Sequence, residues 1–363
     1  MAMNPLEQLN QLGQSVWYDN ISCEMLAAGG LLSTLIKEDD LRGVTSNPVI
    51  YDQAIRSGHY DQSIRDLQKA SKSAETIFYD LAIADIQKAC DLMLPVYQKT
   101  EGLDGYVSLE VSPNLAFDVI GTITEAKALW RRINRKNAMI KIPATIAGIE
   151  AMSHLISEGI NINMTLIFSI KRYLRVIEGY LSGLEARVAT GRSIANVASV
   201  ASFFISRIDA AIDPTLADIA PELQGTIAIS NAKMAHAELL KHFGHARFDA
   251  LSRKGGRIQR LLWASTGTKN PTYADTLYVD ALIGAHTINT MPPATYAAYK
   301  DHGTPNVRLE DDLAAAEANL RALSAHNIDL ESVTQTLEKN GIEQFTAAFN
   351  AMMMTINEKL STV

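Results

Sequence analysis

A lysine interrupts an otherwise apolar stretch of the chain and is the residue best suited to covalent chemistry. Lys141 stands in the run MIKIP at residues 139–143, and near-continuous apolar runs are typical of strands buried on both faces. Burial of an ammonium group is unfavourable unless the group is paired, and a buried amine that loses its proton attacks carbonyl carbons. We therefore expect Lys141 to form a Schiff base. The alternative is a strand-end lysine that extends into solvent.

Polar side chains recur where further β-rich runs end. They are Asp19, Asn47, Glu110, Asn163, Thr165, Ser202, Ser265 and Lys269. Taken singly, Asp19 or Asn47 could cap the following helix, and Glu110 could pair with a buried base. Asn163 and Thr165 could bond the backbone. Together they favour catalysis, because imine formation and carbon–carbon cleavage need acids beside an amine to move protons.

Short β-rich runs alternate with longer helical patterns along the chain. The runs span residues 15–22, 42–50, 105–112, 138–145, 160–169, 197–206, 257–265 and 286–291. Such alternation predicts right-handed βαβ units and a parallel sheet. Eight units favour an α/β fold of the closed (β/α)8 TIM barrel type, in which catalytic groups lie at the C-terminal ends of the strands.

The helical patterns fill the spaces between these runs and continue past them. We predict helices at 74–100, 114–137, 170–190 and 213–243, and at 309–325 and 330–360 in the C-terminal tail. Pro95 should end or kink the first of them. The spacers 51–104 and 207–256 are long enough for additional helices. We expect residues 1–363 to form a single barrel domain with the C-terminal helices packed on it.

Composition limits the function classes. The chain has 363 residues, is 47% hydrophobic and carries a formal net charge of −7, which gives no support for binding nucleic acid or an anionic membrane. No apolar run reaches the roughly 18 residues of a membrane helix. Cys23 and Cys90 are too few for a disulfide or metal framework and suggest a reducing compartment. With no signal-peptide pattern at the N-terminus, we expect a cytoplasmic protein.

Five motifs resemble those of the transaldolase family. They are GVTSNP at 43–48, SLEVSP at 108–113, MIKIPAT at 139–145, NINMTLIFS at 161–169 and the segment 284–292 with HTINTMP. The resemblance extends from near residue 10 to the C-terminus and is greatest for the longer bacterial branch. It implies a class I aldolase-type barrel that needs neither a metal nor a cofactor.

The resemblance also implies a reaction of the pentose phosphate pathway. A dihydroxyacetone unit would move from sedoheptulose 7-phosphate or fructose 6-phosphate to glyceraldehyde 3-phosphate or erythrose 4-phosphate. Lys141 would form the Schiff base at the donor C2, and Asp19 would take the C4 hydroxyl proton and so trigger C3–C4 cleavage. Glu110 would act through a water held by Thr165 during carbinolamine formation and imine hydrolysis.

The implied substrate-binding residues extend from the hydroxyls of the sugar to its phosphate. They are Asn47, Asn163, Ser202, Arg207, Ser265 and Lys269. Arg207 matches the family's arginine, and a guanidinium can contact phosphate through two hydrogen bonds. Other branches carry Ser-Phe-Arg where this chain has STGTK at 265–269. Lys269 would supply the second cation as a point charge rather than a fork, or it is an exposed loop residue.

Two other functions remain open on the sequence. One is a Schiff-base aldolase that releases free dihydroxyacetone, such as fructose-6-phosphate aldolase, which is much shorter and lacks a glutamate at the position of Glu110; deoxyribose-phosphate aldolase is another such enzyme. The other is a non-catalytic barrel that binds sugar phosphates. The sequence does not distinguish a monomer from a homodimer.

Overall fold

The computed structural model describes residues 3–69 and 73–361. In this part of the chain, eight parallel strands close into a barrel in sequence order, and the last strand pairs with the first. The strands are β1 (Gln14–Asp19), β2 (Gly43–Thr45), β3 (Tyr106–Glu110), β4 (Ala138–Pro143), β5 (Ile162–Ile167), β6 (Ser199–Phe204), β7 (Arg260–Ala264) and β8 (Thr287–Met291). All eight predicted strands are present, and the predicted (β/α)8 barrel is confirmed.

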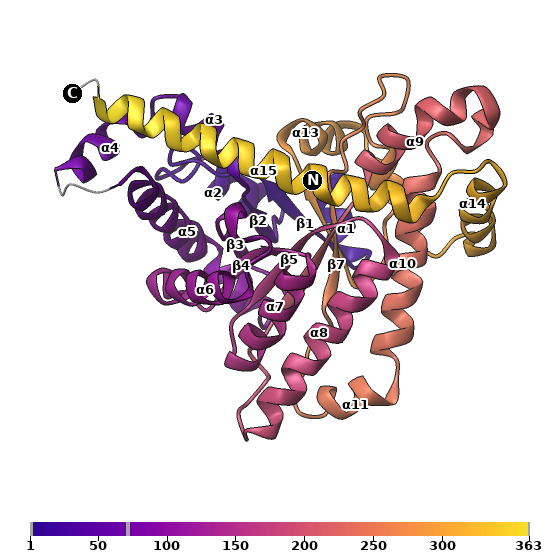
Figure 1. Cartoon of the computed structure of the whole chain (residues 1–363), viewed down its shortest axis with the longest axis horizontal. Helices are drawn as coiled ribbons and strands as arrows, with labels where there is room; N and C mark the ends of the chain where they lie inside the picture. The colour runs from indigo at the N-terminus through magenta and orange to yellow at the C-terminus, as the bar shows by residue number, and fades with distance from the viewer. Residues whose placement is uncertain (1–2, 70–72, 362–363) are drawn as a thin grey trace.

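Helices surround the barrel and extend beyond it (Figure 1). They are α1 (Pro5–Gln11), α2 (Leu31–Glu38), α3 (Pro48–Arg56), α4 (Asp61–Gln68), α5 (Ala74–Lys99), η1 (Pro113–Leu115), α6 (Val119–Ile133), α7 (Ile146–Glu158), α8 (Ile170–Ala189), α9 (Ser206–Ile219), η2 (Pro221–Leu223), α10 (Ile227–Phe243), α11 (Ala246–Ser252), α12 (Leu277–Ala281), α13 (Pro293–His302), α14 (Leu313–Ala325) and α15 (Leu330–Ser361). The additional helices expected in both long spacers are present.

Several predicted boundaries differ from the structure, among them those of the helix predicted at 114–137, which is α6 at Val119–Ile133. Two of the differences have a clear local reason. The second strand ends at Thr45 rather than residue 50, because Asn47 caps α3 and Pro48 occupies its first turn. The predicted helix 213–243 is divided into α9 and α10 by a segment that contains Pro221 and Gly225. Helix α5 matches the predicted range 74–100 and continues through Pro95 to Lys99, so Pro95 does not end it.

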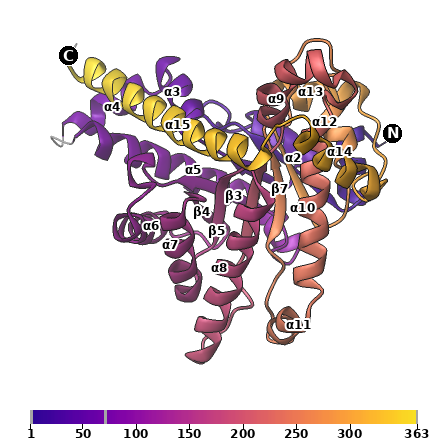
Figure 2. The same cartoon turned by 45° about the vertical axis from the view of Figure 1, so that its right-hand side comes forward.

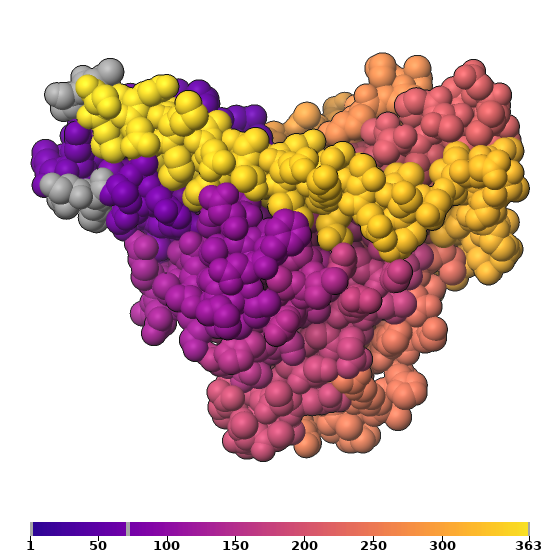
Figure 3. Space-filling view, viewed as in Figure 1, coloured from indigo at the N-terminus to yellow at the C-terminus, as the bar shows by residue number. Residues whose placement is uncertain are grey.

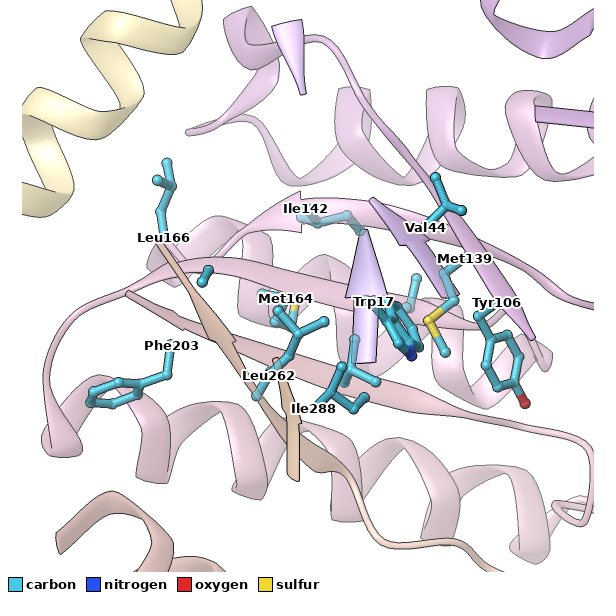
Figure 4. Packing of buried hydrophobic residues seen from close by; sticks show 14 of the residues in the cluster. Trp17, Val44, Tyr106, Met139, Ile142, Met164, Leu166, Phe203, Leu262 and Ile288 are labelled. Carbon is cyan, nitrogen blue, oxygen red and sulfur yellow. The ribbon is translucent and has the colours of Figure 1, made fainter. Parts of the chain in front are cut away.

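The barrel interior is packed with apolar side chains, and Figure 4 shows part of this core. Trp17 of β1 is fully buried within it. Its ring occupies the space beside Gly43 of β2, where any side chain would clash with the indole. At the N-terminal end of the strands, buried Arg260 binds Asp104 at 2.9 Å and Ser15 at 2.5 Å. These paired charges contribute to the stability of this end of the barrel, whereas catalytic groups of such barrels lie at the opposite end.

Helix α15 lies across the C-terminal end of the barrel. Figures 1 and 2 show it running as one long helix over that end, and in Figure 3 its side chains form a continuous band across the molecule. It packs on α3, α9, η1 and β5, which all belong to this side of the barrel. The C-terminal tail therefore forms part of the surroundings of the strand ends. No helix in the described ranges is long and apolar enough to cross a bilayer.

Candidate active site

A cavity of about 450 Å³ lies at the C-terminal ends of the strands, under α15. All ten predicted site residues belong to the described part of the chain, and eight of them line this cavity. These eight are Asp19, Asn47, Lys141, Thr165, Ser202, Arg207, Ser265 and Lys269. They come from six strands or the segments that follow them, so barrel closure gathers residues spread over 250 positions of the chain.

Lys141 and Glu110 form a buried ion pair. They are paired positions on neighbouring strands β4 and β3, and the Lys141 amine lies 3.3 Å from Oε2 of Glu110. The same amine donates a 3.0 Å hydrogen bond to the backbone carbonyl of Ser46. Each of the two residues is only 5% exposed. The lysine thus does not extend into bulk solvent, and its nitrogen faces the cavity beside a carboxylate.

Glu110 and the nearby Thr165 both have unused hydrogen-bonding capacity. The two carboxylate oxygens of Glu110 and the hydroxyl of Thr165 are buried, and none of these three atoms makes a hydrogen bond to a described residue. Buried polar atoms are nearly always satisfied, so groups of this kind are suited to bind water or substrate. Burial raises the pKa of Glu110, while the nearby Lys141 ammonium opposes that shift. A carboxyl with a raised pKa keeps its proton to higher pH, which favours general acid–base catalysis.

Asp19, at the end of β1, is oriented by hydroxyls from two other strands. Thr45 Oγ1 of β2 donates a 2.6 Å hydrogen bond to Asp19 Oδ1, and Thr290 Oγ1 of β8 lies 2.6 Å from Thr45 Oγ1. Burial raises the pKa of Asp19, and Lys141 and the Thr45 hydrogen bond both act to lower it. The carboxylate is therefore held in one orientation within the electrostatic reach of the amine. Thr45 and Thr290 also line the cavity.

The two predicted amides occupy different positions. Asn47 lines the cavity and also caps α3 by accepting a 3.1 Å hydrogen bond from the Ile50 amide, so its capping alternative is confirmed. Asn163 is fully buried behind the cavity wall. Its oxygen accepts a 2.7 Å hydrogen bond from Ser202, and its nitrogen donates to Ser108 at 3.1 Å. Asn163 thus fixes the Ser202 side chain, which does line the cavity.

Cationic side chains mark one side of the cavity. Arg207 is half-buried at the start of α9, its guanidinium lies 5.5 Å from the Phe204 ring centre, and burial lowers its pKa. Lys269 lines the rim and is exposed. Between them Ser265 has a φ of +58°, a conformation unusual for a residue with a side chain and one that clusters at functional sites. This side of the cavity is suited to a dianionic group.

Sequence reasoning missed four residues around the cavity. Thr45 and Thr290 could have been found from the sequence, since both lie in motifs that were noted for other residues. No sequence pattern indicates that Phe345 and Gln344 belong to the site. Both belong to α15, where Phe345 lines the cavity and Gln344 accepts a 2.9 Å hydrogen bond from Arg207. Nothing in the helical pattern of the tail indicates which turn of α15 meets the barrel.

A second cavity, of about 180 Å³, lies between α8 and α15. Its most buried cation, Arg172, is held by Glu338 in a bidentate pair at 2.9 and 3.0 Å, so its charge is already compensated. Among residues 3–69 and 73–361, no group of three or more His, Cys, Asp or Glu side chains is arranged to hold a metal ion. The chemistry of the described chain is concentrated in the larger cavity.

The chain is similar to known proteins over almost its whole length. The family described as transaldolase/fructose-6-phosphate aldolase matches residues 16–356. A transaldolase of Trichodesmium erythraeum is 43% identical over 99% of this chain and 98% of its own length. A transaldolase of Neisseria meningitidis is 44% identical over 97% of this chain and 99% of its own length. A transaldolase of Thiobacillus denitrificans is 42% identical over 98% and 100%, respectively.

Proposed function

The chain belongs to the transaldolase/fructose-6-phosphate aldolase family, and on that premise we propose that it is a transaldolase. It transfers a dihydroxyacetone unit from sedoheptulose 7-phosphate or fructose 6-phosphate to glyceraldehyde 3-phosphate or erythrose 4-phosphate, a step of the pentose phosphate pathway. Relatives that bear the name transaldolase and match nearly the whole chain support this assignment.

One contact carries the proposal. The buried Lys141 amine lies 3.3 Å from Glu110 and faces the cavity that Asp19 and Arg207 also line. An amine, two carboxyl groups and a phosphate-binding cation around one cavity are the groups that a Schiff-base transfer between sugar phosphates requires. A protein that only bound the sugar would not need a buried carboxyl group and a half-buried one beside a buried amine, since removing each charge from water is unfavourable.

The reaction begins at the donor carbonyl. The Lys141 ammonium first passes a proton to Glu110, and the resulting neutral amine attacks C2 of the ketose. The attacking nitrogen then loses a proton and the C2 oxygen gains one, which gives a carbinolamine. Glu110 is the acid nearest to the amine, and it supplies the proton with which the C2 hydroxyl leaves as water. The unused hydroxyl of Thr165 holds that water. The product is a protonated imine whose positive nitrogen serves as an electron sink for the next step.

Cleavage then depends on Asp19. Its carboxylate, held by Thr45, takes the proton of the C4 hydroxyl. The C3–C4 bond breaks, its electron pair moves toward the imine nitrogen, and an aldose phosphate leaves. The remaining three-carbon enamine adds to the acceptor aldehyde, and Asp19 returns its proton to the new hydroxyl. Hydrolysis of the imine, with Glu110 as the base for water, releases the product.

Arg207 and Lys269 bind the phosphate, and Ser265 lies between them at the cavity wall. Arg207 contributes more, because it is half-buried and its planar donors match two phosphate oxygens. Lys269 is exposed at the rim and contributes a weaker, screened attraction. Asn47 and the Asn163–Ser202 pair contact the hydroxyls of the three-carbon unit, Asn163 by fixing Ser202.

Reductive trapping tests the proposal. With fructose 6-phosphate present, borohydride should leave a dihydroxyacetone-derived adduct on the peptide that contains Lys141. A mass shift on a different lysine peptide, or none, would refute the mechanism. In parallel, sedoheptulose 7-phosphate formed from fructose 6-phosphate and erythrose 4-phosphate measures transfer, and free dihydroxyacetone formed without an acceptor measures aldolase activity. An enzyme that mainly releases dihydroxyacetone would be an aldolase.

The proposal extends to the location of the protein. Cys23 and Cys90 are both free thiols, as expected in a reducing compartment. We therefore place the activity in the cytoplasm, which fractionation of the source cells followed by the transfer assay would test. Light scattering of the purified chain would decide between a monomer and a homodimer.

A further inference from the structure

Helix α15 contributes an aromatic ring to the wall of the active-site cavity. Phe345 lines that cavity and is 4% exposed, and its ring centre lies 5.7 Å from the Lys141 amine. This distance is within the range of a cation–π interaction. The ring therefore covers the nitrogen that would carry the covalent intermediate.

Two contacts fix the position of α15 at this point. Gly341, one turn before Phe345, lies so close to Leu166 at the end of β5 that an added Cβ would come within 3.0 Å of a Leu166 methyl carbon. Gln344, the immediate neighbour of Phe345, accepts a 2.9 Å hydrogen bond from Arg207. The helix is thus held both by backbone proximity and by the cation on the phosphate side of the cavity. These contacts therefore fix the position of Phe345 beside Lys141.

Resting on the proposed transaldolase activity, we propose that Phe345 is a specificity-determining residue that keeps bulk solvent, beyond the one water held by Thr165, away from the Lys141 intermediate, so that the three-carbon unit is transferred rather than released. A buried aromatic ring occupies space that water would otherwise fill. Its face also stabilises the positive charge of the protonated imine. The neutral enamine gains less from the ring, but it is sheltered by the same apolar surface until an aldehyde arrives.

The side reaction that Phe345 suppresses needs only water and a proton. C3 of the enamine takes a proton and becomes the protonated imine. Water adds at C2 and loses a proton, which gives a carbinolamine. The C–N bond then breaks, its electron pair stays with the nitrogen, and the nitrogen takes up a proton as the C2 hydroxyl loses one. Free dihydroxyacetone and the lysine amine result, with no oxidation or reduction. Excluding water from the intermediate slows this sequence.

The ratio of release to transfer tests this role. Fructose 6-phosphate and erythrose 4-phosphate are incubated with the full chain, and free dihydroxyacetone and sedoheptulose 7-phosphate are measured in the same sample by proton NMR. Because both products come from one intermediate, their ratio does not depend on how much enzyme is active. We expect Phe345→Ala to raise the ratio by about tenfold or more. Phe345→Leu, which keeps an apolar side chain of intermediate size, should raise it less.

Phe349 offers a matched control on the same helix. It is one turn further along α15 and 3% exposed, and its ring packs against Phe78 with 5.7 Å between ring centres. It does not line the active-site cavity, although it borders a separate cavity of about 10 Å³ whose wall includes Glu110 and Asn47. Phe349→Ala should therefore destabilise the packing of α15 to a similar extent. It leaves the ring that covers the Lys141 amine in place, so the ratio should stay close to that of the wild type.

The outcomes separate this inference from the proposed function. An unchanged ratio in the folded Phe345 variants overturns the role of Phe345, and so does an equal rise in Phe349→Ala, which would indicate general loosening of α15. If Phe345→Ala does not fold, as judged by circular dichroism, the same ratio is measured in Phe345→Leu and Phe345→Val. An unchanged ratio in these variants would again overturn the role of Phe345. A wild-type chain that forms neither a Lys141 adduct nor sedoheptulose 7-phosphate refutes the proposed function instead.

Discussion

The hydroxyl of Thr45 donates a 2.6 Å hydrogen bond to the carboxylate of Asp19. A hydroxyl has one proton to donate, so the 2.6 Å contact between Thr45 and Thr290 must be a hydrogen bond from Thr290 to Thr45. Strands β8 and β2 thus supply two successive donors, and the second donates to the proposed acid–base group on β1. The orientation of Asp19 depends on side chains from three strands.

Removing the Thr45 hydroxyl should change the titration of Asp19. The hydrogen bond from Thr45 lowers the pKa of Asp19, so Thr45→Val should raise that pKa and move the acidic limb of the pH profile of kcat/KM to higher pH. We expect kcat to fall by about tenfold to a hundredfold, with little change in KM. Thr45→Ser keeps the hydroxyl and should restore the profile. An acidic limb at the wild-type pH in Thr45→Val would exclude this coupling.

Replacing Lys141 should abolish transfer and make stability more dependent on pH. Lys141 acts to lower the raised pKa of Glu110, so in Lys141→Met that pKa rises further. A carboxyl whose folded pKa exceeds its unfolded pKa contributes stability below the unfolded value, and this contribution is lost as pH rises through the folded value. We expect Lys141→Met to lose about 3 kcal/mol relative to the wild type at pH 8, measured by urea unfolding.

The double variant Lys141→Met/Glu110→Gln is the control for this effect. In this variant the carboxyl of Glu110 is replaced by an uncharged amide, so no unpaired charge is buried there. Most of the stability lost at pH 8 should therefore return. Transfer activity should stay absent, since the amine is missing. Equal pH dependence in the single and double variants would mean that another group titrates.

Arg207→Ala should weaken binding of phosphorylated sugars selectively. Loss of a half-buried guanidinium should raise KM for fructose 6-phosphate by about a hundredfold, and KM for unphosphorylated fructose much less. Arg207→Lys keeps the charge but not the fork and should give an intermediate value. Lys269→Ala should raise KM by about threefold or less, because an exposed charge is screened. Steady-state kinetics with both sugars measures these changes. An equal rise in KM for fructose 6-phosphate and for fructose would show that Arg207 does not bind the phosphate.

Asp209, in α9, should make the stability of the protein fall between pH 5 and pH 8. It is 1% exposed and accepts hydrogen bonds from the Ala228 amide at 2.7 Å and the Tyr278 hydroxyl at 2.9 Å. Burial, with Asp213 nearby, raises the pKa of Asp209 to about 7. Its protonated form is thus favoured in the folded state, and this contribution is lost as pH rises through about 7.

Asp209→Asn removes this titration while keeping an acceptor for the Ala228 amide. The difference in unfolding free energy between the variant and the wild type should move in favour of the variant, by up to about 2.5 kcal/mol, between pH 5 and pH 8. Asp218→Asn, an exposed change in the same helix, should leave the difference constant. Urea unfolding at several pH values measures both, and parallel curves for Asp209→Asn and the wild type would contradict the prediction.

Much of the barrel and its chemistry follows from local sequence patterns. Apolar runs bounded by polar residues identify eight strands, because the two faces of a buried parallel strand both require apolar side chains. A lysine at 141 and an acid at 110 stand out in such runs, since isolated buried charges are rarely tolerated. Two features that the predicted ranges missed also have local causes, namely the division of α9 from α10 by Pro221 and Gly225 and the end of β2 at Thr45, just before the helix cap Asn47.

Only the tertiary structure decided which of these residues meet. The register of β3 against β4 brings Glu110 beside Lys141, and barrel closure brings Thr290 to Thr45 across 245 positions. Asn163 lies behind the cavity wall rather than in it, and α15 delivers Phe345 to the amine from the far end of the chain. The sequence determined the strands, the helices and the kinds of reactive group, because these depend on near neighbours. The partners of each group depend on strand register and long-range packing, which no local pattern encodes.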